Sequence, residues 1–283
     1  MDVTYVGTDA NGLVKVSEIE AAITPKTCLI TVLMASNETG AVQDIKAISE
    51  VAKKHNVRFH TDGAQAIGKM KVDLVDLGVD YFTFSAHKFH GPKGIGGMFI
   101  KGGAPYTTLI HGSKNVMGGK RAGSLYNNGV AAMAKAVELA NINLSFIDHT
   151  TQAQRDRLED ALLTIPDTKS YVPRVKRLKN LVAMSFRGVE GGSMLWDMNE
   201  NGIYISTGSS CSSEDLEGSA VVEALGEVTE IANTTVMFAL SKFTTDEEID
   251  YVIEKVTTAV ARIRDISMTY AKQEAFSQYV EDH

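Results

Sequence analysis

The sequence predicts an α/β protein whose larger part is built on a mostly parallel sheet. Three apolar stretches that are typical of buried strands each run into polar side chains, which are Asn37, Asp62 and the pair His87 and Lys88. Asn37 and Asp62 are 25 residues apart, and so are Asp62 and His87. This is the repeat of strand–helix–strand units, whose right-handed crossovers put the C-terminal ends of neighbouring strands on one edge of the sheet. Ligands bind at that edge.

The first half of the chain is expected to alternate between strands and helices. The expected elements are a short edge strand at 3–6, a helix at 16–22, strands at 31–35, 57–60 and 81–86, and a last strand at 98–100. Between the first two long strands, apolar residues recur at helical spacing from Ile45 to Ala52, and Asp44 stands where an N-cap is expected. The last strand follows a short glycine-rich loop and can therefore run antiparallel to the others.

The second half is expected to form a smaller α+β domain. Its expected elements are helices at 130–144 and 152–163 with a polar turn at 148–150 between them, a strand at 181–186, a helix at 192–199, a strand at 203–206 and a long last helix. Thr244 and Glu247 fit a capping box for that last helix. We place the domain boundary near residue 144, which gives domains 1–143 and 144–283.

Composition excludes several classes of protein. With 283 residues and a net charge of −7, the chain has no basic excess for binding nucleic acid. No run of 18 apolar residues predicts a membrane span, and the N-terminus has no signal-peptide pattern. Only two cysteines are present, and Cys28, at the start of a buried-type strand, is expected to be an apolar filler. We expect a reduced, cytoplasmic protein that binds neither nucleic acid nor membrane.

The polar residues at the strand ends suit a site for pyridoxal phosphate. Lys88 would form the Schiff base, Asp62 would keep the pyridine nitrogen protonated, and Asn37 would reach the ring hydroxyl. Ser85 and His87 would each donate a hydrogen bond to a phosphate. Each residue also has a structural interpretation, since an aspartate after a strand commonly caps a helix and a lysine is commonly solvated.

Two further residues have open alternatives. Gln65 follows Asp62 and two small residues, and it would either bond the ring hydroxyl or cap a helix. Cys211 lies among small polar residues at 206–213 with no strand or helix period, which predicts a mobile loop. Such a thiol could reach into a site, react and carry a product away, although an incidental surface thiol remains the alternative. No metal-ligand spacing is present.

Five motifs together resemble the cysteine desulfurase family, within the class V aminotransferase group of fold-type I pyridoxal-phosphate enzymes; they are residues 37–40, 59–65, 85–94, 121–124 and 206–211. The resemblance implies a large, incomplete domain and a small C-terminal domain. It implies that Lys88 carries the cofactor, that Asp62 pairs with the ring nitrogen, and that Asn37 and Gln65 contact the ring oxygen. It also implies that Ser85 and His87 bind the phosphate, and that Ser124 reaches the phosphate of the partner subunit in a homodimer. Cys211 would take sulfur from L-cysteine as a persulfide and pass it to an acceptor such as an iron–sulfur scaffold protein or a carrier for tRNA thiolation.

Two departures from the family pattern matter. The N-terminal quarter of the usual family chain is absent, so we expect the isolated chain to be marginally stable, to bind cofactor weakly and to be inactive alone. Met237 stands where the family has an arginine for the substrate carboxylate. Two alternatives therefore stay open: a related lyase or aminotransferase without a catalytic thiol, and an inactive fragment that acts as a binding or scaffold subunit.

Overall fold

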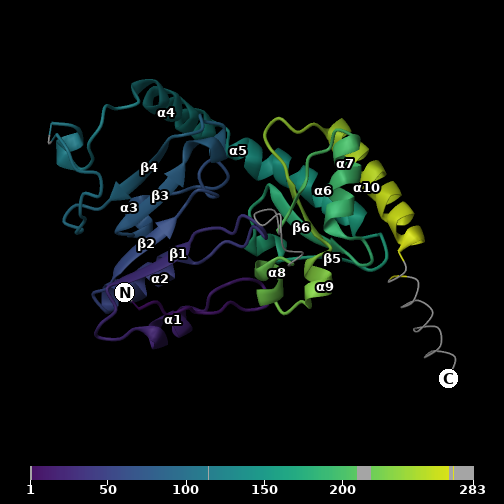
Figure 1. The fold of residues 1–283 in the computed structure, drawn as a ribbon, viewed down its shortest axis with the longest axis horizontal. Helices are drawn as coiled ribbons and strands as arrows, with labels where there is room; N and C mark the ends of the chain where they lie inside the picture. Colours follow the sequence, from purple (N-terminus) through teal and green to yellow (C-terminus); the bar gives the residue numbers. More distant parts are fainter. Residues whose placement is uncertain (1, 114, 209–217, 268–269, 271–283) are drawn as a thin grey trace. The chain divides into compact units, whose positions relative to one another are not determined.

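The computed structural model describes residues 2–113, 115–208, 218–267 and 270 (Figure 1). These residues form two compact units: one comprises residues 16–35 and 43–144, and the other comprises residues 1–15, 36–42 and 145–283. Compact units of this kind are not by themselves independently folding domains. The division into domains 1–143 and 144–283 therefore stays a prediction.

The unit of residues 16–35 and 43–144 contains a four-stranded sheet in the order β1-β2-β3-β4. Its strands are β1 (Leu29–Leu33), β2 (Arg58–Asp62), β3 (Tyr81–Ser85) and β4 (Gly96–Ile100). The pairs β1–β2 and β2–β3 are parallel, whereas β3–β4 is antiparallel. The predicted mostly parallel sheet and its antiparallel last strand are confirmed.

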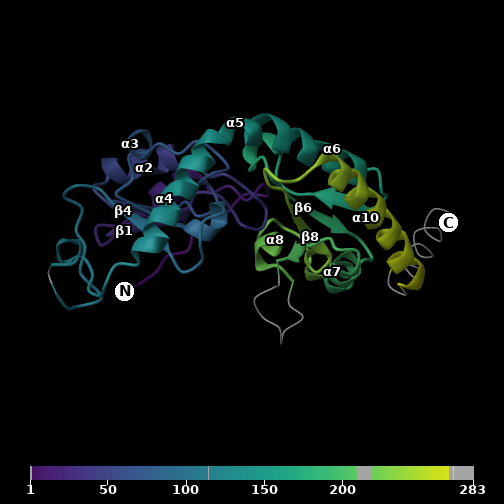
Figure 2. The same ribbon diagram turned by 90° about the horizontal axis from the view of Figure 1, so that it is seen from above.

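Helices connect these strands as the 25-residue spacing requires. The connecting helices are α2 (Ile45–Lys54) and α3 (Leu74–Leu77), and the 3-10 turn η1 (Ala86–Phe89) leads from β3 toward β4. The unit also contains α1 (Val16–Ala22) before β1, and the 3-10 turn η2 (Met117–Gly119) and α4 (Asn127–Ile142) after β4. The carboxylate of Asp44 accepts a 3.0 Å hydrogen bond from the backbone N–H of Ala47 and so caps α2. The buried residues Ile45, Ile48 and Ala52 repeat at helical spacing, and α2 packs on β2 and α3 (Figures 1 and 2).

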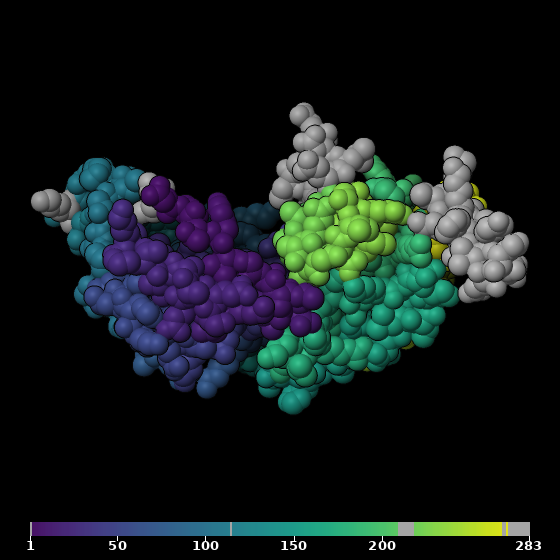
Figure 3. All heavy atoms as spheres, turned by 90° about the horizontal axis from the view of Figure 1, so that it is seen from below, coloured from purple at the N-terminus to yellow at the C-terminus, as the bar shows by residue number. Residues whose placement is uncertain are grey.

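Two expectations for the first 30 residues are wrong. No strand forms at 3–6; an isolated bridge between Thr8 and Val14 is the first pairing among the described residues. A strand needs a hydrogen-bonded neighbour, and here Val3 and Tyr5 are 65% and 91% exposed. The purple N-terminal part of the chain lies on the surface in Figure 3. Cys28 is exposed rather than buried, because it precedes β1, the strand at the end of the sheet.

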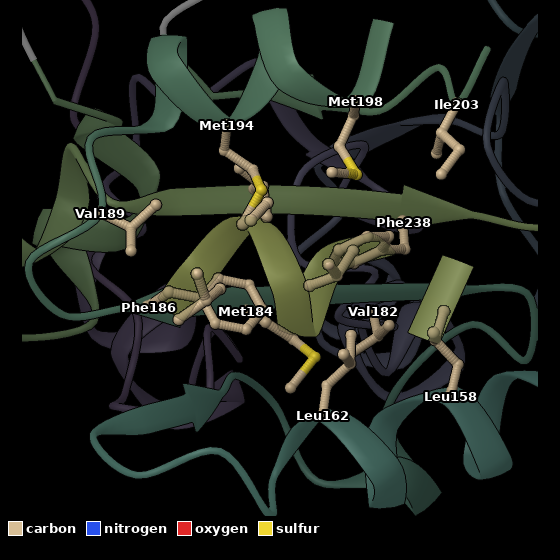
Figure 4. Packing of buried hydrophobic residues seen from close by; sticks show 14 of the residues in the cluster. Leu158, Leu162, Val182, Met184, Phe186, Val189, Met194, Met198, Ile203 and Phe238 are labelled. Carbon is tan, nitrogen blue, oxygen red and sulfur yellow. The ribbon is translucent and has the colours of Figure 1, made fainter. Parts of the chain in front are cut away.

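The other unit contains an antiparallel sheet in the order β5-β6-β8-β7. Its strands are β5 (Thr168–Ser170), β6 (Leu181–Phe186), β7 (Ser206–Thr207) and β8 (Thr235–Ala239); its helices are α5 (Leu144–Phe146), η3 (Ile147–Thr151), α6 (Gln152–Leu162), η4 (Arg174–Lys176), α7 (Gly191–Glu200), α8 (Ala220–Ala224), α9 (Thr229–Ala232) and α10 (Asp246–Ile266). The helix α10 packs against both α6 and α7. Met194 from α7 and Leu162 from α6 meet Val182 and Met184 of β6 in one core (Figure 4).

Three details of this unit differ from the sequence predictions. The capping box of α10 is formed by Thr245 and Glu248, one residue later than predicted, because Thr245 is the residue with extended backbone before the helix. The strand expected at 203–206 is reduced to β7, which pairs with β8 only through Ser206 and Thr207. The expected polar turn at 148–150 lies inside the π-helical turn η3, so the chain stays helical there.

Candidate active site

The turn after β3 presents Lys88 to solvent. Ser85 ends the strand, and the following 3-10 turn η1 buries its first and last residues, Ala86 and Phe89, against Ala136 and Ala140 of α4. Because a 3-10 helix has three residues per turn, positions i and i+3 share one face. The two residues between them, His87 and Lys88, are exposed.

Gly91, two residues after the end of η1, fixes this turn. The backbone N–H of Gly91 donates a 2.9 Å hydrogen bond to the carbonyl oxygen of Ala86. A Cβ at position 91 would lie 2.8 Å from that same oxygen, so a larger residue would force the turn apart. The glycine-rich sequence after Lys88 therefore has a local structural reason.

Asp62 lies at the same sheet edge, at the end of β2 and directly opposite Thr83 in the parallel register. Its Oδ2 accepts a 2.7 Å hydrogen bond from the hydroxyl of Thr83, and its Oδ1 accepts a 3.0 Å bond from the backbone N–H of Ala64. Each carboxylate oxygen keeps a further lone pair, because an ionised carboxyl group has about four acceptor sites. The next residue must be glycine, since a Cβ at Gly63 would overlap the ring of Phe82.

Gln65 is held by a lysine that the sequence analysis did not single out. The Nζ of Lys69 donates a 2.6 Å hydrogen bond to Oε1 of Gln65, which orients the amide NH₂ group away from Lys69. Burial, and to a smaller extent the nearby charge of Lys88, lower the pKa of Lys69 to about 8. Helical spacing was the available signal, because Lys69 stands four residues after Gln65.

This donor set fits pyridoxal phosphate. Asp62 offers a fixed carboxylate for a protonated ring nitrogen, and Gln65 offers amide hydrogens for a ring oxygen. Lys69 and Lys88 repel each other, and an anionic ligand relieves that repulsion. Lys88 also supplies the exposed primary amine that binds an aldehyde.

Lys69→Met is expected to stabilise the cofactor-free protein at neutral pH. The unfolded chain binds the Lys69 proton with the ordinary pKa of 10.5, whereas the folded chain binds it with a pKa of about 8. The charged form therefore costs folding free energy at pH values below about 8, on the order of 2 kcal/mol, and the cost disappears as the pH rises toward 10.5. The wild-type free energy of unfolding should rise with pH across this window, relative to that of the variant.

Urea unfolding of both proteins at pH 7 and near pH 10 measures this difference. The matched control is Lys71→Met, because Lys71 is exposed and close in sequence. Equal pH slopes for the wild type and Lys69→Met would show that Lys69 is not charged at a cost in the folded state.

Asn37 lies in the segment 36–42, which belongs to the other compact unit. This segment is a turn in which Oγ of Ser36 accepts hydrogen bonds from the backbone N–H groups of Glu38 and Thr39, and Asn37 is exposed. Burial raises the pKa of the Glu38 carboxyl, and a 2.5 Å hydrogen bond from Oγ of Ser219 opposes this effect. The structure thus leaves the Asn37 side chain accessible to a ligand.

The remaining predicted residues fall in three different settings. Ser124 is exposed between η2 and α4. Met237 is 7% exposed in β8 and packs with Ala183 and other apolar residues. Cys211 and residues 209–213 of the loop predicted to be mobile lie outside the described residues, whereas Ser206 and Thr207, which that prediction also covered, form β7.

The described residues contain neither a metal-binding cluster nor a single helix that could span a membrane. No group of three or more His, Cys, Asp or Glu side chains within residues 2–113, 115–208 and 218–267 is arranged to hold a metal ion. No single described helix has the length and apolarity to cross a membrane, and the helical stretches Asn127–Ile142 and Leu144–Leu162 reach them only when counted together.

Comparisons with known proteins agree on one family. Residues 1–252 match the family model for class V aminotransferases. The cysteine desulfurase IscS of Clostridium botulinum is 40% identical over 268 residues, covering 94% of this chain and 67% of that protein. The cysteine desulfurase IscS of Methanosarcina thermophila is 38% identical over 272 residues, covering 96% and 67%. This chain therefore spans about two thirds of the length of these relatives.

Solved structures show the same relationship. A NifS-like protein superimposes with a TM-score of 0.85 at 33% identity, over 92% of this chain and 68% of its own. A NifS-like protein from Rickettsia africae superimposes with a TM-score of 0.82 at 25% identity, over 92% and 69%.

Proposed function

This chain belongs to the class V aminotransferase family, whose members use pyridoxal phosphate, and we propose that it functions as a cysteine desulfurase. In this proposal L-cysteine is the substrate, L-alanine is the coproduct, and Cys211 receives the sulfur as a persulfide. The proposal also includes a homodimer and a cytoplasmic location. The sulfur acceptor in the proposal is an iron–sulfur scaffold protein or a carrier for tRNA thiolation, in line with the IscS relatives.

One observation supports the cofactor site most strongly. Lys88 lies in the turn η1 that follows β3, and Asp62 ends the adjacent parallel strand β2, where the register fixes Asp62 against Thr83. A lysine and an aspartate at neighbouring strand ends combine the amine that binds an aldehyde with the anion that binds a protonated ring nitrogen. The bound cofactor supplies an electron sink that is conjugated to the substrate amine.

The residues of the chain divide the remaining work. The Nζ of Lys88 would hold the aldehyde carbon of the cofactor, and the same amine would take the α-proton of the substrate. Asp62 would hold the ring nitrogen, Gln65 and Asn37 would hold the ring oxygen, and Ser85, His87 and the partner subunit's Ser124 would hold the phosphate. The thiolate of Cys211 would attack the sulfur of cysteine, so that an S–S bond forms as the C–S bond breaks; the electron pair of the C–S bond stays with the substrate, which gains a proton to become alanine.

A second candidate function remains for a specific reason. Met237 is buried among apolar side chains, and a thioether cannot make the two charge-assisted hydrogen bonds that an arginine offers to a carboxylate. An inactive binding subunit would tolerate this change, and so would a related lyase or aminotransferase, without a catalytic thiol, that binds the substrate carboxylate through another residue. Incubation with pyridoxal phosphate and L-cysteine separates these functions. Equal amounts of alanine and transferred sulfur support the desulfurase, whereas cofactor binding without sulfur transfer supports the alternatives.

In a protein completed to the length of its relatives, Met237→Arg should lower the KM for L-cysteine by about tenfold or more, because a charge-assisted bidentate contact contributes on the order of 1.5 to 3 kcal/mol. The same change should lower the free energy of unfolding without substrate, since it places a guanidinium group in an apolar cluster. Met237→Lys is the matched control, because it adds the charge without the planar fork. An unchanged KM in Met237→Arg would mean that another residue, such as Arg187, binds the carboxylate or that cysteine is not the substrate.

A further inference from the structure

A chain of hydrogen bonds crosses three strands and ends on Asp62. The imidazole of His60 lies 2.7 Å from Oγ1 of Thr31 through Nδ1 and 3.1 Å from Oγ1 of Thr83 through Nε2. Thr83 in turn donates its hydroxyl hydrogen to Oδ2 of Asp62 at 2.7 Å. The parallel register produces this order, because Thr31 is opposite His60 and Thr83 is opposite Asp62.

The hydrogens in this chain have one consistent arrangement for a neutral imidazole. Thr83 has a single hydroxyl hydrogen, which it donates to Asp62, so its oxygen must accept a hydrogen from Nε2 of His60. The Nδ1 atom then carries the lone pair and accepts the hydroxyl hydrogen of Thr31. Burial lowers the pKa of His60 against the opposing charge of Asp62, which favours this neutral form.

We propose that Thr31, His60 and Thr83 are positioning residues that hold the carboxylate of Asp62 toward the ring nitrogen of the cofactor. This inference rests on the proposed function, because it assumes that pyridoxal phosphate binds at Asp62. Without the hydroxyl of Thr83, the carboxylate keeps the bond from Ala64 but loses the bond that fixes Oδ2. The Asp62 carboxylate is then free to rotate toward Ala64, so the ring nitrogen of the cofactor loses an acceptor with a fixed orientation.

The sheet also provides a matched control. Thr61 lies between His60 and Asp62 in β2, so its side chain points to the opposite face of the sheet. It is fully buried, and its hydroxyl has no hydrogen-bond partner in the described part of the chain. Thr61→Val therefore makes the same chemical change as Thr83→Val, at a residue beside His60 and Asp62 that takes no part in their hydrogen bonds.

The test is a titration of four variants with pyridoxal phosphate, followed by absorbance, after circular dichroism has confirmed folding. Thr83→Val should weaken cofactor binding by about tenfold or more, because it removes a hydrogen bond to a charged group. Thr31→Val, at the exposed end of the chain, should weaken binding less, by about threefold, and should leave folding unaffected. Thr83→Ser, which keeps the hydroxyl, and Thr61→Val should bind like the wild type.

A second measurement examines the hydrogen bonds of His60 in the cofactor-free protein. Long-range ¹H–¹⁵N correlation spectra should show His60 as the Nε2–H tautomer in the wild type and Thr61→Val, and as a mixture of tautomers in Thr31→Val and Thr83→Val. Wild-type cofactor binding with equal affinities for Thr83→Val and Thr61→Val would overturn the positioning role but keep the proposed function. Absence of cofactor binding by the wild type, with a fixed His60 tautomer, would instead overturn the proposed function.

Discussion

Lys88→Ala should abolish covalent attachment of pyridoxal phosphate and lower any cysteine turnover by about a thousandfold or more, because one amine serves both as the attachment point and as the base. Borohydride reduction of the wild-type protein with cofactor, followed by peptide mapping, should place the reduced cofactor on Lys88. The exposed position of Lys88 between two buried anchors of η1 makes it the accessible amine at this sheet edge.

Lys69 is the informative control for this experiment. Burial, and to a smaller extent the charge of Lys88, lower its pKa to about 8, so Lys69 has a larger neutral fraction near neutral pH than an ordinary lysine. Its hydrogen bond to Gln65 nevertheless holds it away from the role of a free nucleophile. Lys69→Met should therefore keep the label on Lys88, whereas a label on Lys69, Lys93 or Lys101 in the wild type would overturn the assignment.

Cys211→Ser should leave cofactor binding unchanged and abolish the release of sulfide from L-cysteine in the presence of a reductant. The reason is that ring chemistry and sulfur transfer use different side chains, and a serine hydroxyl cannot form a persulfide. Cofactor affinity and sulfide production, measured on the same preparation, separate the two steps.

Cys28→Ser is the matched control, because Cys28 is the other cysteine of the chain and is exposed. This variant should retain sulfide release. If Cys211→Ser released sulfide at the wild-type rate, the loop cysteine would be incidental, and the lyase interpretation would replace the desulfurase.

The sequence predicted the parts of the fold that depend on local pattern. The spacing of Asn37, Asp62 and His87 predicted the parallel strands, because each crossover unit needs a similar length of chain. Helix periodicity and Asp44 predicted α2 for the same local reason. The edge strand predicted at 3–6 does not form, since a strand exists only with a hydrogen-bonded partner and local pattern does not show whether one is present.

The candidate site was predictable only in part. The strand ends predicted Asp62 and Lys88 at one edge of the sheet. The bond between Lys69 and Gln65 and the path from Thr31 to Asp62 depend instead on side chains that meet across turns and strands. Alternation along β2 already put His60 and Asp62 on one face, which was the unused signal. The register between strands, which no single segment contains, decides which threonine each of them meets.

Peptide mass spectrometry of the protein, completed to the length of its relatives and incubated with pyridoxal phosphate and L-cysteine, tests the central claim most directly. The trapped thiols should show one additional sulfur atom on the peptide that contains Cys211, and only when cofactor is present. An additional sulfur on the Cys28 peptide, or none on either peptide despite cofactor bound at Lys88, would contradict the assignment of this chain as a cysteine desulfurase.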